Sequence, residues 1–198
     1  TASSTTTITF QNNANPCSSG NQAACDSASL DGTGMLNFNG AAWGASVETV
    51  ASSITKSASA RTMITDGNFE YWLRGPVVTQ AIARDRSSSY TYDFGYTCTA
   101  SCTGNYGSAT WASDTTNKSL HPEFILTFYA GWAGVKVDYI LENVWLAKQQ
   151  DQAYALTLKS AVGLGTTEFS KAYFPHYART RWRRTFWDGT EPSRYKLD

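Results

Sequence analysis

The 198-residue chain is predicted to fold as an all-β, antiparallel two-sheet β-sandwich with long loops and local disulfides. Three observations lead to this fold class. Two long apolar runs flank a glycine-containing connector, many short alternating segments are separated by Gly, Asn and Asp, and no segment has a convincing helical face. Short strands separated by such turn residues are typical of a sandwich or barrel. The length fits one domain over residues 1–198, with residues 1–34 as an N-terminal strand and a disulfide-closed loop extension.

A hairpin between His121 and Trp145 is predicted to form the centre of this fold. Its two apolar-rich runs, Glu123–Ala130 and Val135–Ala147, flank the connector Gly131-Trp132-Ala133-Gly134. Alternation in the second run places one set of residues on one face, namely Val135, Val137, Tyr139, Leu141 and Trp145, and Lys136, Asp138 and Glu142 on the other. A period of two is typical of a half-buried strand, and glycine permits a tight reversal.

Shorter segments on both sides of the hairpin are predicted to supply the other strands. They are Thr5–Gln11, Met35–Asn39, Ser46–Thr55, Arg61–Thr65, Phe69–Leu73, Val77–Ala83, Tyr90–Tyr96, Ala153–Ser160, Glu168–Phe174, His176–Trp187 and a last short strand to Leu197. A helix is possible at Ser46–Thr55, but Thr, Ser and Val disfavour it. Asp66-Gly67 favours a hairpin between Arg61–Thr65 and Phe69–Leu73. The polar stretch before Ser119 is expected to be a long loop.

Four cysteines occur as two close pairs, Cys17 with Cys25 and Cys98 with Cys102. An even number of cysteines at short spacing in loop-like sequence predicts two local disulfides, although four cysteines allow three pairings. A zinc site is disfavoured because neither pair has a two-residue spacing and both histidines lie far away. The cysteines therefore predict an oxidising environment, and the protein is expected to be secreted or at the cell surface.

The composition agrees with that location. Charged residues make up 16% of the chain, below the usual value of about 25%, and aromatic residues make up 14%. Sixteen basic and sixteen acidic residues cancel, so no overall field attracts nucleic acid or an anionic membrane. No apolar run approaches the roughly 20 residues of a membrane span. The polar, uncharged start TASSTTTITF leads us to expect that a leader was removed or lies upstream.

The segment most indicative of function is Tyr173–Trp187, YFPHYARTRWRRTFW. On a strand, alternation places Tyr177, Arg179, Arg181 and Arg183 on one face, and Ala178, Thr180, Trp182, Arg184 and Phe186 on the other. Arginine suits carboxylate or sulfate groups and aromatic rings stack on sugars, so Arg181, Arg183, Trp182 and Trp187 are predicted to bind an acidic polysaccharide. Alternatively, the arginines pair with Asp and Glu of neighbouring strands. Nucleic acid is a poorer partner for so short a patch.

A catalytic role is a third interpretation of this segment. Elimination from a uronic acid needs a cation to neutralise the carboxylate and a base to take the adjacent proton. His176, Tyr177 and Arg179 supply these groups, with His121 as a possible second base. A glycosidase would instead need two carboxylates at a separation that sequence cannot supply. The candidates by residue type are Glu70, Asp93, Asp138 and Glu142.

No cofactor is predicted. Calcium is possible at an oxygen-rich loop that contains Asp26, Asp31, Asn37 and Asn39. The spacing of these residues does not match a known calcium-binding loop, and the ordinary turn chemistry of Asn and Asp explains them better.

Three segments between about Tyr71 and Trp187 resemble a known family. They are YWLRGPVVTQ, LTFYAGWAGVKVDYILENVW and RWRRTFW. They resemble the central β-sandwich of exo-acting rhamnogalacturonan lyases, which are large secreted proteins, in having a GPV strand followed by a long hairpin that ends in EN. The resemblance implies a fold like the galactose-mutarotase supersandwich, and a polysaccharide lyase if the chain is an enzyme. It assigns no catalytic residue.

Two functions follow as expectations. The first is a secreted or cell-surface domain that recognises, and in one version also processes, acidic polysaccharide. The second is a non-enzymatic structural subunit of an extracellular filament or surface layer of identical subunits. The Thr-rich segment Thr1–Phe10 motivates the second, because a terminal strand can complete the sheet of a neighbouring subunit.

Overall fold

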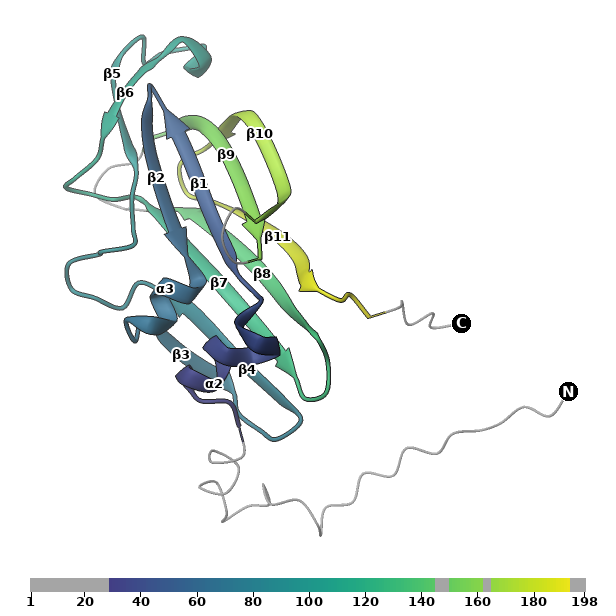
Figure 1. Cartoon of the computed structure of the whole chain (residues 1–198). Helices are drawn as coiled ribbons and strands as arrows, with labels where there is room; N and C mark the ends of the chain where they lie inside the picture. Colours follow the sequence, from purple (N-terminus) through teal and green to yellow (C-terminus); the bar gives the residue numbers. More distant parts are fainter. Residues whose placement is uncertain (1–28, 145–149, 162–164, 193–198) are drawn as a thin grey trace, which may run out of the picture.

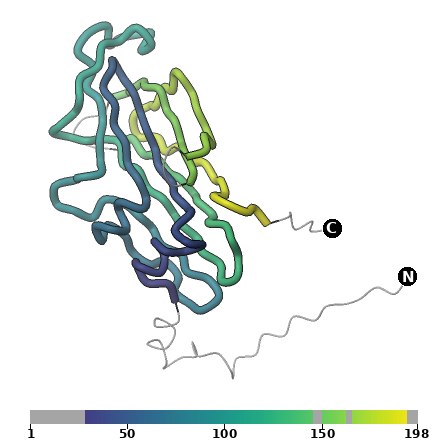
Figure 2. The backbone as a smooth tube through the Cα atoms, in the orientation of Figure 1, coloured from purple at the N-terminus to yellow at the C-terminus, as the bar shows by residue number. Residues whose placement is uncertain are grey.

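The computed structural model describes residues 29–144, 150–161 and 165–192. In this part of the chain, two antiparallel sheets form two layers (Figure 1 and Figure 2). The first sheet has four strands in the order β10 (Thr166–His176), β9 (Gln152–Ser160), β1 (Ala45–Ala51) and β2 (Ile54–Ser59). The second has five strands in the order β11 (Thr180–Gly189), β8 (Gly134–Asn143), β7 (Leu120–Tyr129), β4 (Val78–Arg84) and β3 (Phe69–Leu73). The predicted antiparallel two-sheet sandwich is confirmed.

The central hairpin is formed by β7 and β8, as predicted. Its register runs from Leu120 opposite Asn143 to Phe128 opposite Val135. Val135 and the alternate residues that follow it up to Leu141 are buried against the first sheet, as the period of two indicated. Trp145, predicted on the same face, lies outside the described residues.

Two segments predicted as strands are helical. Met35–Asn39 falls on α2 (Gly32–Asn37) and a 3-10 turn, η1 (Phe38–Ala41), and Arg61–Thr65 falls on α3 (Ala60–Thr65). Asp31 caps α2 by accepting a 2.6 Å hydrogen bond from the Gly34 amide. Gly67, at φ 74°, follows α3 and donates to the Ile64 carbonyl. The Asp-Gly pair therefore ends a helix instead of turning a hairpin, because a left-handed glycine serves both geometries.

Two further strand predictions are wrong in their extent. Ser46–Thr55 is not one strand, because Ser52 and Ser53 both have positive φ and turn the chain from β1 into β2. This hairpin lacks the Asn-Gly signal that usually marks such a turn. Tyr90–Tyr96 is mostly loop, attached to the sheet by a single bridge between Phe94 and Leu120.

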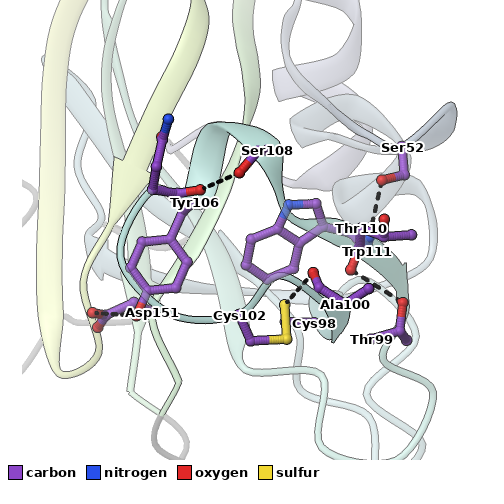
Figure 3. The surroundings of a disulfide bond; sticks show 11 residues. Ser52, Cys98, Thr99, Ala100, Cys102, Tyr106, Ser108, Thr110, Trp111 and Asp151 are labelled. Carbon is purple, nitrogen blue, oxygen red and sulfur yellow. Dashed lines mark hydrogen bonds between the residues drawn. A yellow bond between two sulfur atoms is a disulfide. The ribbon is translucent and has the colours of Figure 1, made fainter.

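The expected long loop before Ser119 contains a small stapled hairpin, β5 (Tyr96–Ala100) and β6 (Thr110–Ser113), with a 3-10 turn, η2 (Tyr106–Ser108), between them. The predicted disulfide between Cys98 and Cys102 is present (Figure 3). The amide of Trp111 donates a 2.9 Å hydrogen bond to Ser52, which ties the hairpin to the β1–β2 turn (Figure 3). The hairpin thus extends one end of the sandwich (Figure 1).

Several sequence predictions lie outside the described residues. They are the Cys17–Cys25 disulfide, the strand Thr5–Gln11 with the assembly role of Thr1–Phe10, and the last strand to Leu197. The subunit function and the secreted or cell-surface location therefore stay predictions. In the described ranges, no helix is long and apolar enough to cross a membrane.

The core between the sheets is aromatic at its centre and ends in a buried polar network. Gln152 of β9 is 1% exposed, and its side-chain oxygen accepts a 2.8 Å hydrogen bond from the Tyr96 amide. Its side-chain nitrogen donates to Ser119 at 2.5 Å and to the side-chain oxygen of Asn143 at 3.2 Å. Asn143 of β8 in turn donates to the carbonyl of His176 at 3.0 Å. Two side-chain amides therefore join both sheets and the stapled hairpin.

Replacing Gln152 with leucine tests this network. We expect Gln152→Leu to lower the free energy of unfolding by about 2–4 kcal/mol, because the Tyr96 amide and the Asn143 side chain lose buried partners. Urea unfolding followed by tryptophan fluorescence measures the change. Gln80→Leu is the matched control, since Gln80 donates to Thr127 on the outer side of the second sheet. An equal decrease in the free energy of unfolding in both variants would contradict a special contribution of the buried network to stability.

Candidate functional site

The side of the five-stranded sheet that faces away from the first sheet carries most of the charged side chains of that sheet. We call it the outer face. Alternation along each strand assigns it Glu70, Val78, Gln80, Ile82, Arg84, His121, Glu123, Ile125, Thr127, Tyr129, Lys136, Asp138, Ile140, Glu142, Arg181, Arg183, Thr185 and Trp187. The opposite side of the same strands supplies the core, so the outer face is set by the register of the hairpin.

Of the predicted row of Tyr177, Arg179, Arg181 and Arg183, the last two lie on this outer face, whereas Tyr177 and Arg179 lie in the turn before β11. Arg181 contacts Glu142, and Arg183 contacts Asp138 with 2.6 Å between Nη2 and Oδ1. Both acids lie on the neighbouring strand β8, so the pairing alternative raised from the sequence describes these arginines. Arg84 on β4 likewise contacts Glu70 and lies 3.8 Å from Glu123. The outer face is therefore a surface of paired charges.

Asp138 is the most tightly held acid of the outer face. Its side chain is 5% exposed, and its carboxylate accepts hydrogen bonds from Arg183 and Thr185 and lies 3.4 Å from Lys136. Burial alone would raise the pKa of Asp138. The hydrogen bonds from Thr185 and Arg183 and the charges of Lys136 and Arg183 outweigh burial and lower the pKa below 3.8.

The three residues predicted to be catalytic occupy different environments. The predicted strand His176–Trp187 is broken at Tyr177–Arg179, where Arg179 has φ 61° and donates its amide to Asn143 at 2.6 Å. Tyr177, in this turn, is 56% exposed, whereas His176 is 2% exposed. The catalytic role of these residues stays a prediction, and their positions do not form one site.

Both ring nitrogens of His176 are bonded in the core. Nε2 lies 3.1 Å from the carbonyl of Thr180, which can only accept, so Nε2 carries the proton. Nδ1 then accepts from the hydroxyl of Tyr154 at 2.7 Å. Burial lowers the pKa of His176, partly offset by the Thr180 carbonyl. These contacts describe a neutral, structural histidine.

The two tryptophans predicted to bind ligand lie on opposite sides of β11. Trp182 packs into the core, with its ring 4.9 Å from that of Phe169 and 5.4 Å from that of Phe174. Trp187 lies on the outer face and stacks on Tyr129 at 6.1 Å with an interplanar angle of 25°. Of the two, only Trp187 can offer a ring to a ligand on the outer face.

A cavity of about 410 Å³ lies at the other end of the outer face, beside the loop that follows β4. Its lining residues are Arg84, Asp85, Arg86, Asp93, His121, Pro122, Glu123 and Glu142. The ring of His121 forms a 2.5 Å contact between Nδ1 and the buried carboxylate of Asp93. Burial raises the pKa of Asp93, and the hydrogen bond and charge of His121 partly offset this rise.

The wall of this cavity is built by Asp85. Its carboxylate accepts hydrogen bonds from the amide and hydroxyl of Ser87, at 2.8 and 2.6 Å, and from the amide of Tyr92 at 2.5 Å. Burial alone would raise the pKa of Asp85, but these hydrogen bonds outweigh burial and lower the pKa. Asp93 follows Tyr92 in the chain and contacts His121 on β7. The loop from Asp85 to Asp93 is therefore held at its start by Asp85 and at its end by Asp93.

Glu123 and Asp85 are the acids of this cavity that the sequence analysis did not name as candidates. Burial raises the pKa of Glu123, the charge of Arg84 lowers it and the charge of Glu142 raises it, with a net rise. In the sequence, Glu123 stands at the start of an apolar run. The available signal was its charge at an alternate position of a strand, two residues after His121. His121, Asp93 and Glu142 were named from the sequence, but nothing in the sequence joined them.

The oxygen-rich residues considered for calcium have structural contacts where they are described. Asp31 caps α2, and the side chain of Asn39 donates to the Ala133 carbonyl at 2.9 Å. Asn37 ends α2, and Asp26 lies outside the described residues. Within the described ranges, no group of three or more His, Cys, Asp or Glu side chains is arranged to hold a metal ion.

Comparisons with known proteins give no match. No family model, curated protein or solved structure matches the chain. The resemblance to rhamnogalacturonan lyases therefore stays a prediction, and the function has to be argued from the outer face and its cavity.

Replacing Asp138 with asparagine tests the charge network of the outer face. Because the folded pKa of Asp138 lies below 3.8, its stabilising effect is present above that pH and is lost as pH falls through the folded value. We expect Asp138→Asn to lower the free energy of unfolding by about 1–3 kcal/mol at pH 7. The difference from wild type should shrink below about pH 4.

Urea unfolding between pH 3 and pH 8 measures this dependence. Glu48→Gln is the control, because exposed Glu48 lies 4.0 Å from Lys159 on the first sheet and such pairs contribute at most about 1 kcal/mol. A loss for Asp138→Asn that is independent of pH would contradict the role assigned to the carboxylate.

Proposed function

We propose that the protein binds a neutral polysaccharide along its outer face. The observation that carries the proposal is the combination, on one sheet face, of paired charges and the stacked rings of Tyr129 and Trp187. Sugars present hydroxyl groups that both donate and accept, and apolar C–H surfaces. Paired arginines and carboxylates offer donors and acceptors side by side, and aromatic rings cover apolar surface.

The length of the outer face supports a polymeric ligand. The cavity lies at the His121 end of β7 and the stacked rings lie at its Tyr129 end. These residues are eight positions apart, which corresponds to about 26 Å at ~3.3 Å per residue. A chain of several sugars spans such a distance, whereas a single sugar does not.

The pairing of the arginines supports a neutral ligand over the acidic one expected from the sequence. Arg181 and Arg183 each hold a carboxylate of β8, so a uronate would have to displace Glu142 or Asp138. Such an exchange replaces one ion pair with another and gains little. Hydroxyl groups can bond to both partners without separating them. Binding of an acidic polysaccharide is thus the alternative result that the binding test must distinguish.

Affinity electrophoresis tests the proposal. We expect purified protein to be retarded in gels that contain one or more of the neutral glucans, mannans, galactans or xylans, and to migrate freely through uronic acid polymers. Trp187→Ala should weaken retardation about tenfold, because it removes a stacking surface. Tyr177→Ala is the matched control, since Tyr177 is an exposed aromatic residue that lies outside the outer face. Circular dichroism confirms that both variants fold.

Three outcomes would overturn the proposal. Free migration in every gel would exclude polysaccharide binding. Retardation by uronic acid polymers alone would support the acidic ligand expected from the sequence. Retardation that depends on Tyr177 and not on Trp187 would place the ligand at the turn between β10 and β11.

A further inference from the structure

We propose that the cavity at the end of the outer face hydrolyses a glycosidic bond of the bound polysaccharide, with Glu123 as proton donor and Glu142 as the opposing carboxylate. This inference rests on the proposed function, since the polysaccharide would reach the cavity along the outer face. Both glutamates line the same cavity of about 410 Å³.

The register of the hairpin places the two glutamates next to each other on one face of the sheet. His121 of β7 pairs with Glu142 of β8, and Glu123 pairs with Ile140. Glu123 and Glu142 are therefore diagonal neighbours on one face of adjacent strands, a relation that places the backbones of such residues about 7–8 Å apart. From such positions two glutamate side chains can bring their carboxyl groups within the separation of about 5–9.5 Å that glycosidases use. The register thus supplies the proximity of the two acids that the sequence lacked.

The two carboxylates differ in how closely a cation holds them. Arg181 contacts Glu142 through both Nε and Nη2, and both contacts fall on Oε1. The side chain of Glu123 is 24% exposed, Arg84 lies 3.8 Å from its carboxylate, and Glu142 is its diagonal neighbour. Burial and the charge of Glu142 raise the pKa of Glu123, which keeps it protonated to higher pH.

The loop that lines the cavity is also held in place by hydrogen bonds. These are the hydrogen bonds of Asp85 and the contact between Asp93 and His121. His121 lies directly across from Glu142 in the register. We assign His121 a positioning role, since Asp93 fixes its ring beside the carboxylate that must face the sugar.

The chemical step requires only water as a second reactant. Glu123 gives its proton to the glycosidic oxygen while the bond between that oxygen and the anomeric carbon breaks, and the bonding electron pair leaves with the oxygen. Glu142 either takes a proton from the water that attacks the anomeric carbon or bonds to that carbon until water replaces it. The products are two shorter sugar chains, one of which has a new reducing end.

The experiment measures new reducing ends released by the full chain from each neutral polysaccharide that retards it in a gel. We expect Glu123→Gln and Glu142→Gln each to lower kcat/KM about 100-fold or more, while retardation stays within about threefold of wild type. Glu48→Gln, on the first sheet, should leave release unchanged. The rate should fall as pH rises through the pKa of Glu123, which follows from its role as the acid.

Each outcome separates hydrolysis from binding. Retardation without release by the wild-type chain would overturn hydrolysis and leave the proposed binding intact. Release that persists in both glutamine variants would place the activity elsewhere and also overturn the assignment, as would products with an unsaturated sugar ring, which indicate elimination. Absence of retardation, by contrast, would overturn the proposed binding function itself.

Discussion

The buried amides of Gln152 and Asn143 form the contact on which the rest of the structure depends. The two inner faces of the sandwich are apolar, and apolar contact alone favours burial without fixing direction. The amides add direction, because each has donors and an acceptor that only one placement of the strands satisfies. A slip of β8 or β9 by one residue would remove these bonds and turn the core residues outward.

The same register determines the outer face. Asn143 pairs with Leu120 on one side and Thr180 on the other. One position earlier, Glu142 therefore stands between His121 of β7 and Arg181 of β11. The alignment of the core therefore also determines the charge pairs, since successive residues of one strand point to opposite faces of the sheet. A polar contact in the interior thus also positions the charged residues on the opposite face of the same sheet.

The sequence was sufficient for features that arise from local periodicity or spacing. The β7–β8 hairpin, its buried residues such as Tyr139, and the Cys98–Cys102 disulfide follow from alternation and close cysteines. It was insufficient where geometry depends on distant partners. The turn at Tyr177–Arg179 contains neither Gly nor Pro, and it forms because the Arg179 amide bonds to Asn143 of another strand.

The arginine row shows the same dependence on distant partners. For this reason a row of arginines in a sequence is a weak guide to the charge of the ligand. From sequence alone Arg181 and Arg183 are a cationic stripe, because their partners are separated from them by about 40 residues. In the sheet each guanidinium already holds a carboxylate, and its remaining capacity is for hydrogen bonds. A pair of guanidinium and carboxylate presents polar donors and acceptors with almost no net charge. Such a surface discriminates by the arrangement of hydroxyl groups, so strand pairing, more than the number of arginines, sets the class of ligand.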